Sequence, residues 1–209
     1  MPGAVTTVNP PPTTTATSSP RPRRGREDVL TAATALFHER GYDATSMSDI
    51  AARLGFTKAA LYRHVTGKAE LLRAITRPVR ADVRALLAAS TAGDDRPVDQ
   101  LSELLRGLAG AAAADPGRYV LFWGPDGERS PHGPDAVCRA AVVQRLTELL
   151  ERAADRGEIR DGIVPHLAAR LLVGAVTGPG RPVSPSAVDV LLDGPVRRLN
   201  DGAGRGRGR

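Results

Sequence analysis

The side chains best suited to bind a polyanion are gathered in one short stretch, FTKAALYRHVTGK. It contains Lys58, Arg63 and Lys68 without any acidic residue, and Tyr62 and His64 add hydrogen-bond donors. Such groups bind phosphate oxygens, which position a protein on nucleic acid more than they read its sequence. The alternative is that Tyr62 is a core aromatic and His64 an exposed polar residue. The stretch therefore indicates either a nucleic-acid surface or an ordinary basic helix face.

Two short helices are predicted around this stretch. Ser46 and Asp49 match a capping box, which predicts a helix over residues 47–54 that ends at Gly55. Thr57 is a suitable cap for the next short helix, which carries the basic residues. Two helices joined by so tight a turn form a helix-turn-helix, whose second helix can enter a DNA major groove.

Longer helices flank this pair. Apolar residues at helical spacing from Val29 to Phe37 predict a helix that stops at Gly41. A fourth helix is expected to begin around Lys68. Pro78 should end or kink it, because proline lacks a backbone donor and clashes with the preceding turn.

Composition predicts an all-α fold. The chain has 209 residues, of which 41% are hydrophobic and only 3% aromatic, so its core must consist largely of Ala, Leu and Val. A single cysteine, Cys138, cannot form an intramolecular disulfide and suits a reducing cytoplasm. The sequence lacks an apolar run of membrane-spanning length and a secretory signal pattern. We therefore expect a cytoplasmic protein that has no membrane partner.

The positive charge is concentrated at the two ends of the chain. Residues 1–26 carry four Arg and no acid, and residues 201–209 carry three Arg and one Asp. These ends account for the whole net charge of +6. Residues 1–25, rich in Pro, Thr and Ser, are predicted to be a disordered basic arm, and residues 201–209 a flexible Arg/Gly tail. Basic ends of this kind either touch nucleic acid or only improve solubility.

One segment resembles a known family. VLTAATALFHERGYDATSMSDIAARLGFTKAALYRHVTGKAELLRAI is similar to the N-terminal domain of the tetracycline-repressor (TetR) family, because A..LF.E.GY..TS, DIA..LG, TKAALYRH and GK.ELL occur in that order. Val65 departs from the family, which usually has Phe there. The resemblance implies a helix-turn-helix DNA-binding domain over residues 26–72. It also implies a helical regulatory and dimerisation domain over residues 73–200.

The resemblance also assigns site residues. Thr57, Lys58, Tyr62 and His64 correspond to recognition-helix residues that meet DNA. Thr45 and Ser46 lie where the second helix commonly touches a phosphate, and Lys68 matches the lysine that opens the fourth helix. Two further residues can contact DNA: the Ala59 methyl can touch a thymine methyl, and Arg63 can reach guanine or a phosphate.

The C-terminal region offers a candidate ligand pocket and a dimer interface. Tyr119, Phe122 and Trp123 form an aromatic cluster that suits a small apolar ligand, although core packing explains the cluster equally well. In the family, the last two long helices form a four-helix dimer interface. Small residues along PHLAARLLVGAVTG permit such close helix approach, but an Ala-rich monomer core has the same composition.

These features favour a dimeric, sequence-specific transcriptional regulator that binds a palindromic operator. The resemblance implies a repressor released by an unknown small-molecule effector, although activators also occur in the family. A sequence-nonspecific architectural DNA-binding protein is the alternative, since neutralising the backbone requires only positive charge. Familiar catalytic motifs and metal-type histidine spacing are missing from the sequence, so we expect no enzyme activity, no cofactor and no metal.

Overall fold

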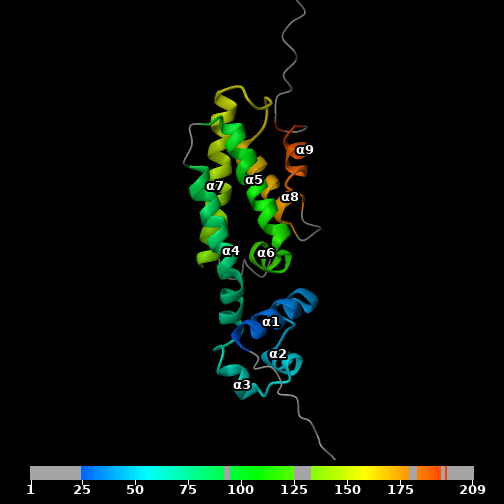
Figure 1. Ribbon diagram of the computed structural model, residues 1–209. Coiled ribbons are helices and arrows are strands. Elements are labelled where there is room, and N and C mark those ends of the chain that lie inside the picture. The colour runs from blue at the N-terminus through cyan, green and yellow to red at the C-terminus, as the bar shows by residue number, and fades with distance from the viewer. Residues whose placement is uncertain (1–24, 92–94, 125–132, 179–182, 194–195, 197–209) are drawn as a thin grey trace, which may run out of the picture.

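The computed structural model describes the following parts of the chain: residues 25–91, 95–124, 133–178, 183–193 and 196. The tail predicted over 201–209, and the arm predicted over 1–25 except for Gly25, lie outside them. The described residues form nine α-helices, which confirms the predicted all-α fold (Figure 1). Within those ranges, none of the helices is both long and apolar enough to cross a membrane.

Helices α1 (Arg26–Arg40), α2 (Met47–Leu54) and α3 (Lys58–Tyr62) lie together at one end of the molecule (Figure 1). The capping predictions are confirmed. The Ser46 hydroxyl accepts from the Asp49 backbone N–H at 3.1 Å, and the Asp49 carboxylate accepts from the Ser46 backbone N–H at 2.8 Å. Gly55 ends α2 with φ of 68°, a left-handed conformation that favours glycine. The Thr57 hydroxyl accepts from the Ala60 backbone N–H at 3.1 Å and caps α3.

Helix α4 (Lys68–Ser90) runs from this end into the rest of the molecule (Figure 1). Of the two outcomes expected at Pro78, an end or a kink, the end is wrong, because α4 continues through Pro78 for three more turns. Its buried residues explain why: Leu71, Ile75, Val79 and Val83 lie four residues apart and form one stripe along the helix. Burial of this stripe on both sides of the proline outweighs the lost backbone hydrogen bond, and the Pro78 ring faces solvent.

The remaining helices form a bundle around the second half of α4. They are α5 (Pro97–Ala114), α6 (Pro116–Trp123), α7 (Pro134–Asp155), α8 (Pro165–Thr177) and α9 (Ala187–Asp193). Four of them begin with proline, whose fixed φ suits the first helical position and whose missing N–H has no helical acceptor there. The Arg145 guanidinium of α7 donates to the Ser90 hydroxyl at 3.2 Å, which joins α7 to the end of α4.

The molecule has two hydrophobic cores. The first belongs to what we call the N-terminal unit, helices α1–α3 and the start of α4 as far as Ile75. The second belongs to the bundle and begins at Val79. Helix α6 contributes to both, because Leu121 is buried in the first core, whereas Tyr119 and Phe122 are buried in the second. The domain boundary expected at residue 72 stays a prediction.

Candidate nucleic-acid interface

Helix α3 lies at the far end of the N-terminal unit (Figure 1), and its basic residue Lys58 and, just after the helix, Arg63 are exposed. Leu61 is fully buried and holds α3 in place, whereas the side chains of Lys58 and Ala59 are exposed. Tyr62 is 43% exposed, and Arg63 after it is exposed as well. Five of the predicted DNA-contact side chains thus point outward, the fifth being Thr57 at the helix cap.

The positive charges near α3 differ in their availability. The Arg53 guanidinium donates to both carboxylate oxygens of Glu39, at 2.6 and 3.2 Å, and this hydrogen bonding lowers the pKa of Glu39. In contrast, Lys58 and Arg63 have no ion-pair partner among the residues that the structure describes. These two cations therefore remain available for an anionic partner such as phosphate.

Lys68 is the residue whose position differs most from a phosphate contact. Its Nζ donates to three backbone carbonyl oxygens: those of Tyr42 at 2.8 Å, Thr45 at 2.9 Å and Asp43 at 3.2 Å. The ammonium also lies 4.4 Å from the centroid of the Tyr42 ring. An ammonium has three N–H donors, so these carbonyls occupy all of them. In this structure Lys68 fixes the α1–α2 turn and has no donor left for DNA.

The remaining predicted DNA contacts, Thr45, Ser46 and His64, also differ in whether their side chains are exposed. Thr45 is buried, and its hydroxyl donates to the Gly41 carbonyl at 2.8 Å. Ser46 is exposed, but its hydroxyl belongs to the capping box, and its hydrogen bonds lower the pKa of Asp49. His64 is half-buried, and its ring stacks on Phe56 with 5.9 Å between centroids. Only Ser46 of these residues lies open to a ligand.

A polar cluster behind α3 was not predicted. The Glu70 carboxylate accepts from the backbone N–H and hydroxyl of Thr66 and from the Arg26 guanidinium at 3.0 Å. The Thr66 hydrogen bonds, followed by that of Arg26, lower the pKa of Glu70 to about 2. Arg26 also donates to the His64 carbonyl, so the cluster joins α1, the end of α3 and α4. Glu70 lies three residues after the cap Gly67, a capping spacing that could have revealed it.

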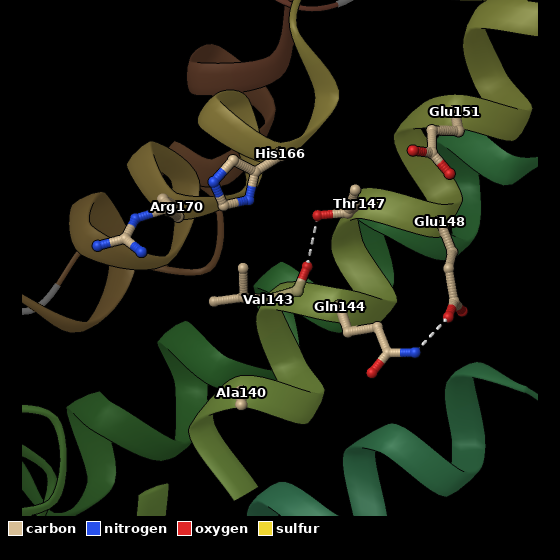
Figure 2. Close-up of a pocket in the computed structure, with 8 residues that line it drawn as sticks. All are labelled: Ala140, Val143, Gln144, Thr147, Glu148, Glu151, His166 and Arg170. Atoms are coloured by element: carbon tan, nitrogen blue, oxygen red, sulfur yellow. Dashed lines mark hydrogen bonds between the residues drawn. The ribbon is translucent and has the colours of Figure 1, made fainter. Parts of the chain in front are cut away.

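The predicted pocket residues lie in the core of the bundle. Tyr119 and Phe122 are buried and Trp123 is half-buried, and the ring centroids of Phe122 and Trp123 are 5.3 Å apart. The cavity beside Tyr119 has a volume of only about 10 Å³. A much larger hollow, about 520 Å³, lies between α7 and α8 and is open to solvent (Figure 2). Of the three predicted pocket residues, only Tyr119 lines the small cavity, whereas Phe122 and Trp123 pack against each other.

Comparison with known proteins agrees with this architecture. The sequence model described as "Bacterial regulatory proteins, tetR family" matches residues 29–75. A helix-turn-helix-type transcriptional regulator of Mycobacterium tuberculosis is 31% identical over 202 residues, which are 92% of this chain and 94% of that protein. The transcriptional repressor BdcR of Escherichia coli is 35% identical over 91 residues, 43% of this chain and 46% of BdcR.

A solved structure extends the likeness to the fold. The TetR-family transcriptional regulator PfmR of Thermus thermophilus superposes with a TM-score of 0.66 over 86% of this chain and 99% of PfmR, at 24% identity. The likeness to the mycobacterial regulator covers nearly the full length of both chains and therefore includes the bundle as well as the N-terminal unit. The chain belongs to the tetR family of bacterial regulatory proteins and is a transcriptional regulator with a helix-turn-helix DNA-binding domain.

Proposed function

We propose that this regulator is a homodimeric repressor that binds a palindromic operator and is released from it by a small molecule. The observation that carries the proposal is the outer surface of α3, where Lys58, Tyr62 and Arg63 are exposed beside the capping Thr57. The two cations have no ion-pair partner within the described ranges and can each neutralise a phosphate. BdcR, a named repressor, supports the sign of regulation.

In this proposal the DNA-contact residues take two roles. Ser46, Thr57, Lys58, Ala59, Tyr62 and Arg63 face the DNA, and Arg63 or the Ala59 methyl contacts base edges. Thr45, His64 and Lys68 hold the α1–α2 turn and the end of α3 in position. Lys68 then affects DNA binding through the geometry of the turn that precedes α2.

The dimer interface is proposed on α7 and α8. Leu171 is 75% exposed, and Val164, Leu167 and Gly174 continue its stripe along α8. An apolar stripe of this kind marks a protein interface. The hollow beside it is bordered by Glu148 and Glu151 of α7 and by His166 and Arg170 of α8 (Figure 2). In a two-fold dimer, the edge of α7 that carries Glu148 and Glu151 can approach Arg170 of the other protomer, which supports a second copy of this chain as the occupant.

Two helices connect the bundle to the N-terminal unit. Helix α4 passes through both cores, and α6 packs against α1 as well as within the bundle. A Cβ added to Gly117 of α6 would lie 3.3 Å from the Thr34 side chain of α1, so the two helices approach closely there. A ligand lowers DNA affinity only if it prefers a state in which the recognition helices are wrongly placed. We propose that α4 and α6 transmit that change.

Selection from a randomised duplex library tests the proposal. We expect enrichment of a palindrome whose half-sites are about one helical turn apart, bound at least ~10³-fold more tightly than random DNA. Leu171→Glu should abolish the dimer in sedimentation and weaken binding to the full palindrome while leaving the fold intact. Retention of DNA without enrichment would instead favour an architectural, nonspecific role. No retention by protein freed of small molecules would refute DNA binding.

A further inference from the structure

Two buried hydrogen-bond donors on α6 have no partner among the described residues. The Tyr119 hydroxyl and the Trp123 indole N–H are both inaccessible to solvent, and neither makes a hydrogen bond within the part of the chain that the structure describes. Tyr119 is only 2% exposed as a whole residue. Buried polar groups in folded proteins nearly always have partners, because an unpaired one loses its hydration without compensation. Two such groups on one short helix require an explanation.

The two donors share one face of α6. Tyr119 and Trp123 are four residues apart, so their side chains emerge on the same side of the helix. A cavity of about 10 Å³ adjoins Tyr119 and is lined by Ala112, Val176 and Thr177, among others. That volume is at the lower limit for a single water molecule. The Thr177 hydroxyl cannot serve as a donor there, because it already donates to the Val173 carbonyl at 2.7 Å.

The charges around this face disfavour an anionic ligand. Arg139 donates to the Phe122 carbonyl at 2.7 Å, and Arg80 is paired with Asp135. Burial, followed by the negative charge of Asp82, raises the pKa of Tyr119 well above its ordinary value, so the hydroxyl remains a donor at physiological pH. A carboxylate brought to this face would find Arg80 and Arg139 already engaged, so its burial would be costly. A neutral oxygen acceptor would instead pair with donors that have no partner among the described residues.

We infer that the effector of the repressor proposed above is a neutral, mainly apolar molecule with a carbonyl-type oxygen that accepts hydrogen bonds from Tyr119 and Trp123. The inference rests on the proposed function. Binding widens the small cavity and displaces the inner face of α6. The other side of α6 carries Leu121 into the core of the N-terminal unit, so the same helix connects the ligand to the DNA-binding surface.

Three probes of similar size separate the effects of a hydrogen-bond acceptor, of shape and of charge on binding. They are 2-octanone, which has the acceptor; 2-methyl-1-octene, which has the same shape without it; and octanoate, which is charged. Trp123 is the only tryptophan in the chain, so its fluorescence reports directly on the site. We expect the ketone to bind roughly 10-fold more tightly than the alkene, and octanoate to bind most weakly. Tyr119→Phe should reduce the ketone preference roughly 5-fold and leave alkene affinity unchanged.

A matched control and a stability measurement complete the test. Thr177→Val removes another hydroxyl from the same cavity, but one that is already paired, and should leave the ketone preference unchanged. Because the Tyr119 hydroxyl lacks a partner, Tyr119→Phe should not lower the melting temperature. Trp123→Phe, measured by thermal shift because it removes the fluorophore, should also reduce the ketone preference.

Three results would overturn the inference: equal binding of ketone and alkene, no binding of any probe, or a clear loss of stability in Tyr119→Phe. The library selection separates this outcome from failure of the proposed function. An enriched palindrome, together with equal binding of the three probes, would support the proposed repressor and refute the proposed class of ligand. If the protein discriminates between the probes but does not bind DNA, the neutral-ligand site would be supported and the proposed repressor refuted.

Discussion

The N-terminal unit and the bundle differ in how far side-chain caps define the ends of their helices. In the N-terminal unit, Ser46 bonds Asp49 and Thr57 bonds Ala60, each three residues away. In the bundle, Arg80 pairs with Asp135 and Arg145 with Ser90, each 55 residues away, and most of the core is Leu, Val and Ala. Local caps select one geometry, whereas an aliphatic core accepts many sequences of similar volume. The helix ends of the N-terminal unit are therefore defined locally, whereas the bundle depends on contacts between residues far apart in the sequence.

The largest effect is expected from a cavity in the bundle. Leu146→Ala removes a fully buried side chain from the second core and should lower the free energy of unfolding by about 2–5 kcal/mol. Val190→Ala on the exposed surface of α9 is the control and should change it by less than ~0.5 kcal/mol. Urea denaturation followed by circular dichroism measures both. Equal losses in the two variants would contradict the assignment of Leu146 to the core.

The same substitution at two lysines of the N-terminal unit distinguishes a lysine that stabilises the fold from one that contacts DNA. Lys68→Met removes the ammonium from three carbonyls and should cost about 2 kcal/mol of stability. Lys58→Met should change the free energy of unfolding by less than ~0.5 kcal/mol. It should weaken binding to all duplexes alike and reduce by about 1 the slope of the logarithm of the binding constant against the logarithm of the salt concentration. Denaturation and salt-dependent DNA titrations measure these effects. An unchanged stability in Lys68→Met would show that the turn does not depend on it.

Acid should weaken the N-terminal unit through Glu70. Its pKa is about 2 in the folded protein, below the ordinary value of 4.5, so it contributes stability above pH 4.5 that is lost as the pH falls toward 2. Glu70→Gln should remove this part of the pH dependence in that window. Melting temperatures between pH 2 and pH 6 measure it. Parallel curves for the wild type and the variant would contradict the prediction.

The smallest effect is expected at the cap of α2. Ser46→Ala removes the acceptor for the Asp49 N–H and should cost about 1 kcal/mol. Ser48→Ala, at an exposed position inside the same helix, should be neutral or slightly stabilising, since alanine has the higher helix propensity. Thermal unfolding compares the two variants. A loss in Ser48→Ala as large as that in Ser46→Ala would remove the special role of the cap.

The same contrast explains which features could be predicted. The helices of the N-terminal unit, with their caps at Ser46 and Thr57 and the turn at Gly55, were predictable because each depends on residues a few positions apart. The continuation of α4 through Pro78 was not, since it depends on burial against α5, α6 and α7, which no local pattern reveals.

Side-chain roles were harder to predict than helices. The sequence places Lys58 and Lys68 in one basic stretch, but only the folded arrangement brings the Tyr42 and Thr45 carbonyls to Lys68. Aromatic clustering predicted that Tyr119 and Trp123 lie together. That their donors have no partner within the described ranges depends on every neighbouring helix and could not be inferred from composition.

The position of Pro78 has a mechanical consequence. It lies between Ile75, the last fully buried α4 residue of the first core, and Val79, the first of the second, so α4 lacks one backbone hydrogen bond between the two cores. We therefore expect α4 to bend most easily there. Helix α6 packs against α1 at a second point, so we expect a displacement of α6 to rotate the N-terminal unit about Pro78. A local shift in the interior would then produce an angular change at the tip of the molecule.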